Sequence, residues 1–399
     1  MIVTDIGPGL DALDLDAGIR TELRRQGVVT CAQLFDILRG PAGEDLFRRI
    51  IGSDETERAA WLGKIGSRLP AEQVRAQASC DYRLPSLSGL AGPSEDSAII
   101  RRRRAVTARD RKALVKRVRE IREAGDLPTR SLLTDYGTPV RDQGSLGSCT
   151  GWGSTANREM LVQLMLSPLF AYLMAKQLDG HPELEGSWQH FCFEAFSRFG
   201  QLREIDFPYT DRPGDFDRER YREVAAEFRI DGYVDLLPDP EDIALLPTLM
   251  KAILAGRLTG ELGPQGMSVS VPVGSSWEES TTFLYGLVRL EPDKFVPRGG
   301  HAMYVEGYID GDDPDGLYDT DYFVVKNSWG TGWARENLLG LPGYALFPAQ
   351  YFARPDLVWE ALLCIAEPSP VRGRRGLLDR LRLGWETDTL SVPAACRAF

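Results

Sequence analysis

The sequence predicts an α+β protein in which a small all-α domain precedes one large domain of mixed helices and strands. Two observations support this prediction. Apolar residues recur at helical spacing through the first 75 residues, and helical and strand patterns alternate from residue 127 to residue 367. The chain has 399 residues, 43% hydrophobic and 26% charged, which is typical of a folded protein with two or three domains.

Residues 1–75 are interpreted as the small helical domain. Thr30, with Gln33 three residues later, forms a capping box ahead of an apolar stripe, and Gly40 and Pro41 end that stripe. Residues 24–38 resemble helix-hairpin-helix or SAM-like modules, which bind DNA or other proteins. Over residues 1–75 the numbers of acidic and basic side chains are nearly balanced, which favours a protein partner for this domain. A packing domain without a ligand is the open alternative.

Residues 76–126 are predicted to form a linker followed by a basic amphipathic helix. Residues 80–100 are rich in Ser, Gly and Pro, whereas residues 101–123 carry 11 basic and 3 acidic side chains. Leu114, Val118 and Ile121 recur at helical spacing. We expect this segment to dock by its charge on the acidic domain that follows, as a candidate pro-segment. A solvated linker helix is the alternative.

Charge and composition exclude several classes of function. The chain has 47 Lys and Arg against 58 Asp and Glu, and a net charge of -11 argues against nucleic acid as the main partner. No apolar stretch approaches the roughly 18 residues of a membrane span, and the first residues lack a secretion signal. We therefore expect a cytoplasmic protein without membrane contact.

Six scattered cysteines show no spacing typical of a metal site, so neither a disulfide, a metal nor a cofactor is expected. We expect five of them to be small buried apolar residues: Cys31, Cys80, Cys192, Cys364 and Cys396. Of the three histidines, His181 and His190 are expected at the surface or in packing. The acidic run over residues 310–321 is interpreted as a hairpin loop, because the ligand positions of a calcium loop are not occupied.

In the large domain, helical spacing predicts helices over residues 160–178, with a break at Ser167 and Pro168. Alternating patterns rich in Val, Tyr and Phe predict strands over residues 268–273, 300–309 and 322–327. The tail, residues 368–399, shows one short amphipathic helical pattern.

Three motifs occur in order in this domain: Gln-Gly-Ser-Leu-Gly-Ser-Cys over residues 143–149, Gly-Gly-His-Ala over 299–302, and Asn-Ser-Trp-Gly-Thr-Gly-Trp over 327–333. His301 follows Cys149 by 152 residues, and Asn327 follows His301 by 26. The order and spacing resemble the papain-like cysteine peptidases of the C1 family. The resemblance covers residues 127–367, including Phe-Pro-Tyr over 207–209. It implies a two-lobed domain, with a helical lobe starting at Cys149 and a β-rich lobe carrying His301 and Asn327.

The resemblance assigns a catalytic role to four residues. Cys149 would be the nucleophile, because a thiol at a helix N-terminus beside an imidazolium can ionise well below pH 7. His301 would hold the proton and pass it to the leaving amine, and Asn327 would orient the imidazole ring. Gln143 would donate a hydrogen bond to the oxyanion together with the backbone N–H of Cys149.

The substrate side of the cleft is expected to include Gly300 and Trp329 next to the leaving group, with Trp329 also shielding the His301 bond. Gly299 and Ala302 would leave a roomy non-primed pocket. The chain departs from the family pattern at four places, which indicates a divergent, bacterial-type member. Thr150 stands where the family usually has a Trp, and Ala334 stands where it has a Gly. Gly186-Ser187 is a loose substitute for the Cys-x-Gly-Gly of the family's substrate-binding loop. Leu146 replaces a disulfide cysteine of secreted relatives.

These residues predict a cysteine endopeptidase that works through an acyl-enzyme on a protein or peptide substrate. A dedicated enzyme that processes one partner, recruited by residues 1–75, fits the added helical domain. Two alternatives stay open. One is an inactive protease homologue that binds peptides, although a binding module has no need of a nucleophile. The other is an acyltransferase or amidase that uses the same thiolate.

Overall fold

The structure is a computed structural model of the chain, and it describes residues 6–40, 55–71, 74, 108–181, 184–260, 263–293 and 295–365. Several predicted segments lie outside the described residues: residues 41–54 of the N-terminal region, the linker over 80–100, the arginines over 101–104 and the tail over 368–399.

The N-terminal region forms the predicted helices. They are α1 (Ala17–Arg25), α2 (Cys31–Arg39) and α4 (Glu55–Gly66), with a short 3-10 helix η1 (Leu10–Ala12). The predicted capping box starts α2: the Thr30 hydroxyl accepts from the Gln33 backbone N–H at 3.1 Å, and the Gln33 side chain accepts from the Thr30 N–H at 3.2 Å. Local chemistry therefore sets the start of this helix.

The helical lobe consists mainly of α8 (Cys149–Val162), α9 (Pro168–Asp179) and α10 (Gln189–Arg198), followed by η2 (Glu219–Tyr221) and α11 (Arg222–Ala226). Glycines let α8 approach its neighbours closely. A Cβ on Gly151 would lie 2.3 Å from the Pro168 carbonyl oxygen of α9, and one on Gly153 would lie 3.0 Å from the Met303 backbone. These contacts fix the start of α8 against α9 and against the sheet.

The β-rich lobe is one antiparallel sheet in the order β2-β7-β3-β4-β5-β6, with β1 paired to β4. Its strands are β1 (Arg130–Leu132), β2 (Gly232–Asp235), β3 (Met267–Val273), β4 (Gly299–Ile309), β5 (Tyr322–Lys326), β6 (Tyr344–Pro348) and β7 (Glu360–Ile365). Short helices connect them: η3 (Pro240–Leu245), α12 (Leu246–Leu254), η5 (Ser275–Glu278), α13 (Ser280–Tyr285) and η6 (Ala349–Ala353). The α+β fold predicted from the sequence is confirmed.

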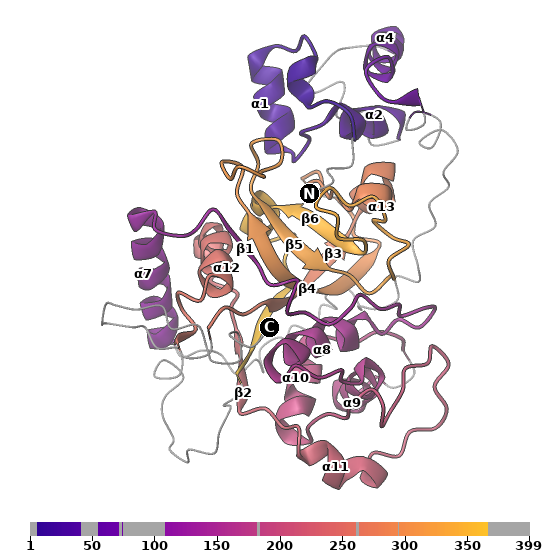
Figure 1. Cartoon of the computed structure of the whole chain (residues 1–399), viewed down its shortest axis with the longest axis vertical. Coiled ribbons are helices and arrows are strands. Elements are labelled where there is room, and N and C mark those ends of the chain that lie inside the picture. Colours follow the sequence, from indigo (N-terminus) through magenta and orange to yellow (C-terminus); the bar gives the residue numbers. More distant parts are fainter. Residues whose placement is uncertain are drawn as a thin grey trace.

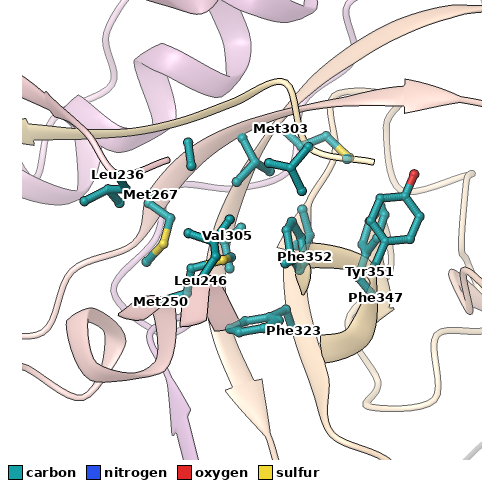
Figure 2. Close-up of a cluster of buried hydrophobic side chains, with 14 of the residues drawn as sticks. Leu236, Leu246, Met250, Met267, Met303, Val305, Phe323, Phe347, Tyr351 and Phe352 are labelled. Atoms are coloured by element: carbon teal, nitrogen blue, oxygen red, sulfur yellow. The ribbon is translucent and has the colours of Figure 1, made fainter. Parts of the chain in front are cut away.

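The two faces of the sheet bury two different cores, because alternate side chains of a strand point to opposite faces. Phe323 and Val325 of β5 pack in the largest core with α12 and η6. Figure 2 shows Phe323 there beside Leu246, Met250 and Phe352. On the other face, Tyr322 and Val324 of the same strand pack in a core shared with the N-terminal helices. Members of this core include Leu10, Leu34, Leu38, Leu284 and Leu346.

The N-terminal helices lie at the other end of the sheet from α8, α9 and α10 (Figure 1). Polar contacts add to the shared apolar core, because the half-buried Asp36 carboxylate of α2 accepts from the Ser280 hydroxyl and the Thr281 backbone N–H at the start of α13. The described part of residues 1–75 is thus packed onto the β-rich lobe, and one side of it is not free to meet a partner.

The basic helix forms as α7 (Ala108–Ala124), but charge is not its main attachment. Leu114, Val118 and Ile121 are buried in the largest core, beside α12 and η3 (Figure 1). Burial of such side chains contributes about 1.5 to 3 kcal/mol each, whereas the exposed Arg119–Asp242 ion pair contributes about 0.2 to 1 kcal/mol. The sequence-based expectation of electrostatic docking was therefore wrong in its physical cause. The described part of α7 packs on α12, away from Cys149, His301 and Asn327.

Candidate active site

Cys149 is the first residue of α8, as the sequence predicted. Its side chain is 1% exposed and contacts Ala302 of β4, so the end of the helical lobe meets the sheet at the thiol. The N–H groups of a helix N-terminus and the helix dipole favour negative charge at this position. The Ser148 side chain does not cap the helix, which leaves these donors directed at the site.

His301 lies on β4, and its Nε2 is 2.7 Å from the Asn327 side-chain oxygen at the end of β5. Because that oxygen can only accept, Nε2 carries a proton in this bond. The Trp329 ring stacks on the imidazole with centroids 4.5 Å apart, and the Trp277 ring meets it edge-on at 5.8 Å. The antiparallel pairing of β4 and β5 thus joins two residues 26 positions apart, and aromatic rings cover their hydrogen bond.

Gln143 lies in the loop before α8, and hydrogen bonds hold both its backbone and its side chain. Its backbone N–H donates to the Ser328 carbonyl at 2.8 Å, and its side-chain oxygen accepts from the Ser328 hydroxyl at 2.6 Å. This second bond fixes which end of the amide is the donor. Nε2 donates one hydrogen to the Leu146 carbonyl at 3.0 Å and keeps a second hydrogen for another acceptor.

Burial opposes charge on both members of the predicted ion pair. It raises the pKa of the Cys149 thiol to about 12, an effect that hydrogen bonds from the backbone of Ala302 and Thr150 offset only in part. It lowers the pKa of His301 to about 4, although the Asn327 bond favours the protonated ring. Burial of this closed site therefore opposes the resting thiolate–imidazolium pair expected from the sequence.

This electrostatic state predicts the pH dependence of alkylation. Iodoacetamide reacts with the thiolate, whose fraction grows about tenfold per pH unit while the pH is below the pKa. We expect the alkylation rate of Cys149 in the folded chain to rise steeply from pH 6 to pH 9, measured by peptide mapping. A rate that is flat over this range would show that His301 already holds the thiol proton, and would contradict a raised pKa of the Cys149 thiol.

The predicted substrate-side residues lie where the two lobes meet. Gly299 and Gly300 begin β4 directly before His301, and Ala302 is buried against Cys149. Two tryptophans that the sequence did not single out, Trp188 and Trp359, pack against this contact, with ring centroids 5.9 Å apart. These aromatic side chains border the nucleophile.

The loop before Trp188 is anchored from α9. Lys176 donates to the Gly186 carbonyl at 2.8 Å and pairs with Asp179, which also accepts from the Ser187 hydroxyl at 2.9 Å. The buried ion pair therefore holds residues 186–187 close to the site. The sequence predicted these two residues as a loose substitute for the family's substrate-binding loop, and we keep that role as a prediction.

The other histidines and cysteines that the structure describes behave as structural residues. His190 bonds to the Glu360 carboxylate at 2.7 Å, and His181 is exposed. Cys31, Cys192 and Cys364 are buried free thiols, whereas Cys80 and Cys396 lie outside the described residues. Ala334 adopts a left-handed backbone with φ of +47°, which explains why glycine is the family's usual residue there.

Sequence reasoning missed the side chains that hold the loop between Gln143 and Cys149. Ser328 lies inside the Asn-Ser-Trp motif, and Tyr209 lies inside the Phe-Pro-Tyr motif, so both were visible without an assigned role. Their contacts join residues far apart in the chain, and spacing alone gives no signal for them.

The comparison with known families agrees with this geometry. The family model described as papain family cysteine protease matches residues 129–341, more than half of the chain. The chain belongs to the papain family of cysteine proteases, and the predicted resemblance is confirmed.

Individual relatives show how far the similarity extends. Cathepsin J of Mus musculus is 30% identical over 218 residues, 52% of this chain and 56% of the relative. Procathepsin L of Mus musculus is 27% identical over 209 residues, 51% of this chain and 56% of the relative. The chain spans about half the length of these curated relatives.

Among solved structures, xylellain, a cysteine protease from Xylella fastidiosa, aligns with a TM-score of 0.51 and 20% identity. The alignment covers 72% of this chain and all of that structure, which shows a shared fold. Within the part of the chain that the structure describes, no helix is long and apolar enough to cross a membrane.

Proposed function

We propose that the chain is a cysteine endopeptidase that hydrolyses peptide bonds through a thioester acyl-enzyme. The observation that carries the proposal is the 2.7 Å bond between His301 and Asn327 on the strands that face the N-terminus of α8, where Cys149 lies. A thiol, an oriented imidazole and a fixed amide donor in Gln143 are the groups that such a reaction needs.

In the proposed reaction, the Cys149 proton moves to His301 and the sulfur attacks the carbonyl carbon. The carbonyl π electrons move to the oxygen, which becomes an oxyanion next to the Cys149 N–H and the Gln143 side chain. When the oxyanion collapses, the C–N bond breaks and His301 gives its proton to the leaving amine. Water then attacks the thioester with His301 as base, which releases the acid and restores the thiol.

Substrate binding has to open the site before this reaction starts. Cys149 is 1% exposed and His301 is 2% exposed, and burial in the closed arrangement opposes charge on both. A site opened to water lowers the cost of charging each group. Proton transfer from Cys149 to His301 would then accompany opening, and substrate would meet the reactive pair.

The substrate that we propose is a specific protein, recognised with the help of the N-terminal helices. The face of these helices that packs on the sheet is already buried, so recruitment would use their outer face. A cytoplasmic location and a bacterial-type enzyme fit the replacement of a disulfide cysteine by Leu146. The inactive protease homologue is less well supported, because the His301–Asn327 bond has no purpose in a peptide-binding cleft.

The experiment that tests the proposal combines labelling with hydrolysis. We expect a thiol-directed peptidyl epoxide to add once, at Cys149, and to stop cleavage of internal bonds in an unfolded protein, both measured by mass spectrometry. Addition of a primary amine should leave the free-acid products dominant. If amide products dominate, the acyl-enzyme transfers to amines and the chain is an acyltransferase. If an unlabelled chain produces no cleavage, the endopeptidase proposal fails.

A further inference from the structure

A single tyrosine connects the two halves of the oxyanion site. The Tyr209 hydroxyl donates to the backbone carbonyl of Gln143 at 2.7 Å and lies 2.6 Å from the Ser148 hydroxyl. Because the tyrosine proton is used on the carbonyl, the Ser148 hydroxyl donates to the phenol oxygen. The bridge therefore runs from the residue before the nucleophile to the residue that supplies the side-chain oxyanion donor.

The phenol is itself held in place. The Tyr209 ring lies on Trp152 of α8, with centroids 4.6 Å apart, and its backbone N–H donates to Glu204 at 2.9 Å. Burial raises the pKa of Tyr209 above its usual value, so the hydroxyl keeps its proton near neutral pH. The donor to the Gln143 carbonyl is thus present near neutral pH.

A second contact from the same segment supports the loop between Gln143 and Cys149. The Asp211 carboxylate accepts from the Ser145 hydroxyl at 2.8 Å and from the Ser145 backbone N–H at 3.3 Å. Gly144 is left-handed, and a Cβ there would lie 2.9 Å from the Asp211 oxygen. Residues 209–211 therefore hold both the ends and the middle of the loop.

We propose that Tyr209 is a positioning residue for the oxyanion donors of this site, an inference that rests on the proposed peptidase activity. It touches neither substrate nor reacting atoms. It fixes the distance between the Gln143 backbone and the start of α8, and both oxyanion donors depend on that distance. Donors stabilise an oxyanion only when they are placed correctly beforehand, so a small displacement lowers the rate.

Tyr209→Phe tests the proposal, because it keeps the ring on Trp152 and removes only the hydroxyl. Loss of one positioning hydrogen bond should lower kcat on a fluorogenic peptide by about 3- to 10-fold. The inhibition constant of a peptide aldehyde, which forms an oxyanion on the thiol, should rise by a similar factor. KM and the iodoacetamide rate of Cys149 should stay within about twofold, since alkylation forms no oxyanion.

Tyr308→Phe is the matched control. The Tyr308 hydroxyl also donates to a backbone carbonyl, that of Pro128, at 2.7 Å, but it lies at the far end of β4 from His301. We expect this variant to keep wild-type kcat and aldehyde affinity. Ser148→Ala removes the other end of the bridge and should reproduce the effect of Tyr209→Phe, which provides a second test if Tyr209→Phe folds poorly.

The outcomes separate the two proposals. Unchanged kcat and aldehyde affinity in Tyr209→Phe and Ser148→Ala would overturn the positioning role while the wild type remains active. Equal losses in every measured constant, shared with Tyr308→Phe, would indicate general loosening and would overturn it as well. A wild-type chain that neither cleaves the peptide nor binds the aldehyde would refute the proposed function, and the positioning role with it.

Discussion

Cys149→Ala is expected to abolish peptide hydrolysis, with activity at least about 10⁴-fold below wild type, because no other group in the site can form the thioester. The side chain is buried and small, so the substitution removes one sulfur atom from a contact with Ala302 and the fold should persist. The measurement is cleavage of a fluorogenic peptide by chains shown to be folded by circular dichroism.

Cys31→Ala provides the matched control for that variant. Cys31 is also buried, but it starts α2 in the N-terminal helices, at the other end of the sheet from α8 (Figure 1). This control should retain wild-type kcat. Hydrolysis by Cys149→Ala at the wild-type rate would end the cysteine peptidase proposal, whatever the control shows.

Gln143→Ala is expected to lower kcat by about 10²-fold or more with little change in KM. The bond to the oxyanion forms mainly in the transition state, so its loss does not weaken ground-state binding. Steady-state kinetics on the fluorogenic peptide separate the two constants. A change confined to KM would mean that Gln143 shapes the cleft without stabilising the oxyanion.

Two further variants distinguish loss of the Gln143 amide donor from a general loss of structure. Gln143→Glu keeps an oxygen that can accept from the Ser328 hydroxyl but removes the amide donor, so kcat should fall at least as far as in Gln143→Ala. Gln201→Ala removes a buried glutamine that bonds to Thr155 inside the helical lobe, and it should leave kcat unchanged. A loss of kcat in Gln201→Ala equal to that in Gln143→Ala would attribute both to unfolding.

The sequence by itself was sufficient for features that short-range chemistry controls. The capping box at Thr30 starts α2, and Pro168 begins α9 after the predicted break. Alternation of apolar residues located β3, β4 and β5 to within one residue. The three motifs and their order were enough to identify the family, because they combine nucleophile, orienting residue and spacing.

Only the tertiary structure decided how the charges of this protein behave. From sequence, the helix N-terminus and His301 favour an ionised Cys149, but ionisation also depends on water, and spacing says nothing about burial. In the folded chain desolvation is the largest influence on both groups, and it opposes charge on Cys149 and on His301. Burial also outweighs charge at the basic helix α7, because its three buried apolar side chains contribute more to docking than its charged side chains do.

Contacts between distant segments were also beyond the sequence. Tyr209 lies 66 residues from Gln143 and 61 from Ser148, yet its hydroxyl reaches both. The core shared by the N-terminal helices and the sheet likewise joins Asp36 to Ser280 across 244 residues. The sequence shows which side chains are of a type that can react. Their positions and charge states follow from which distant surfaces pack together and exclude water.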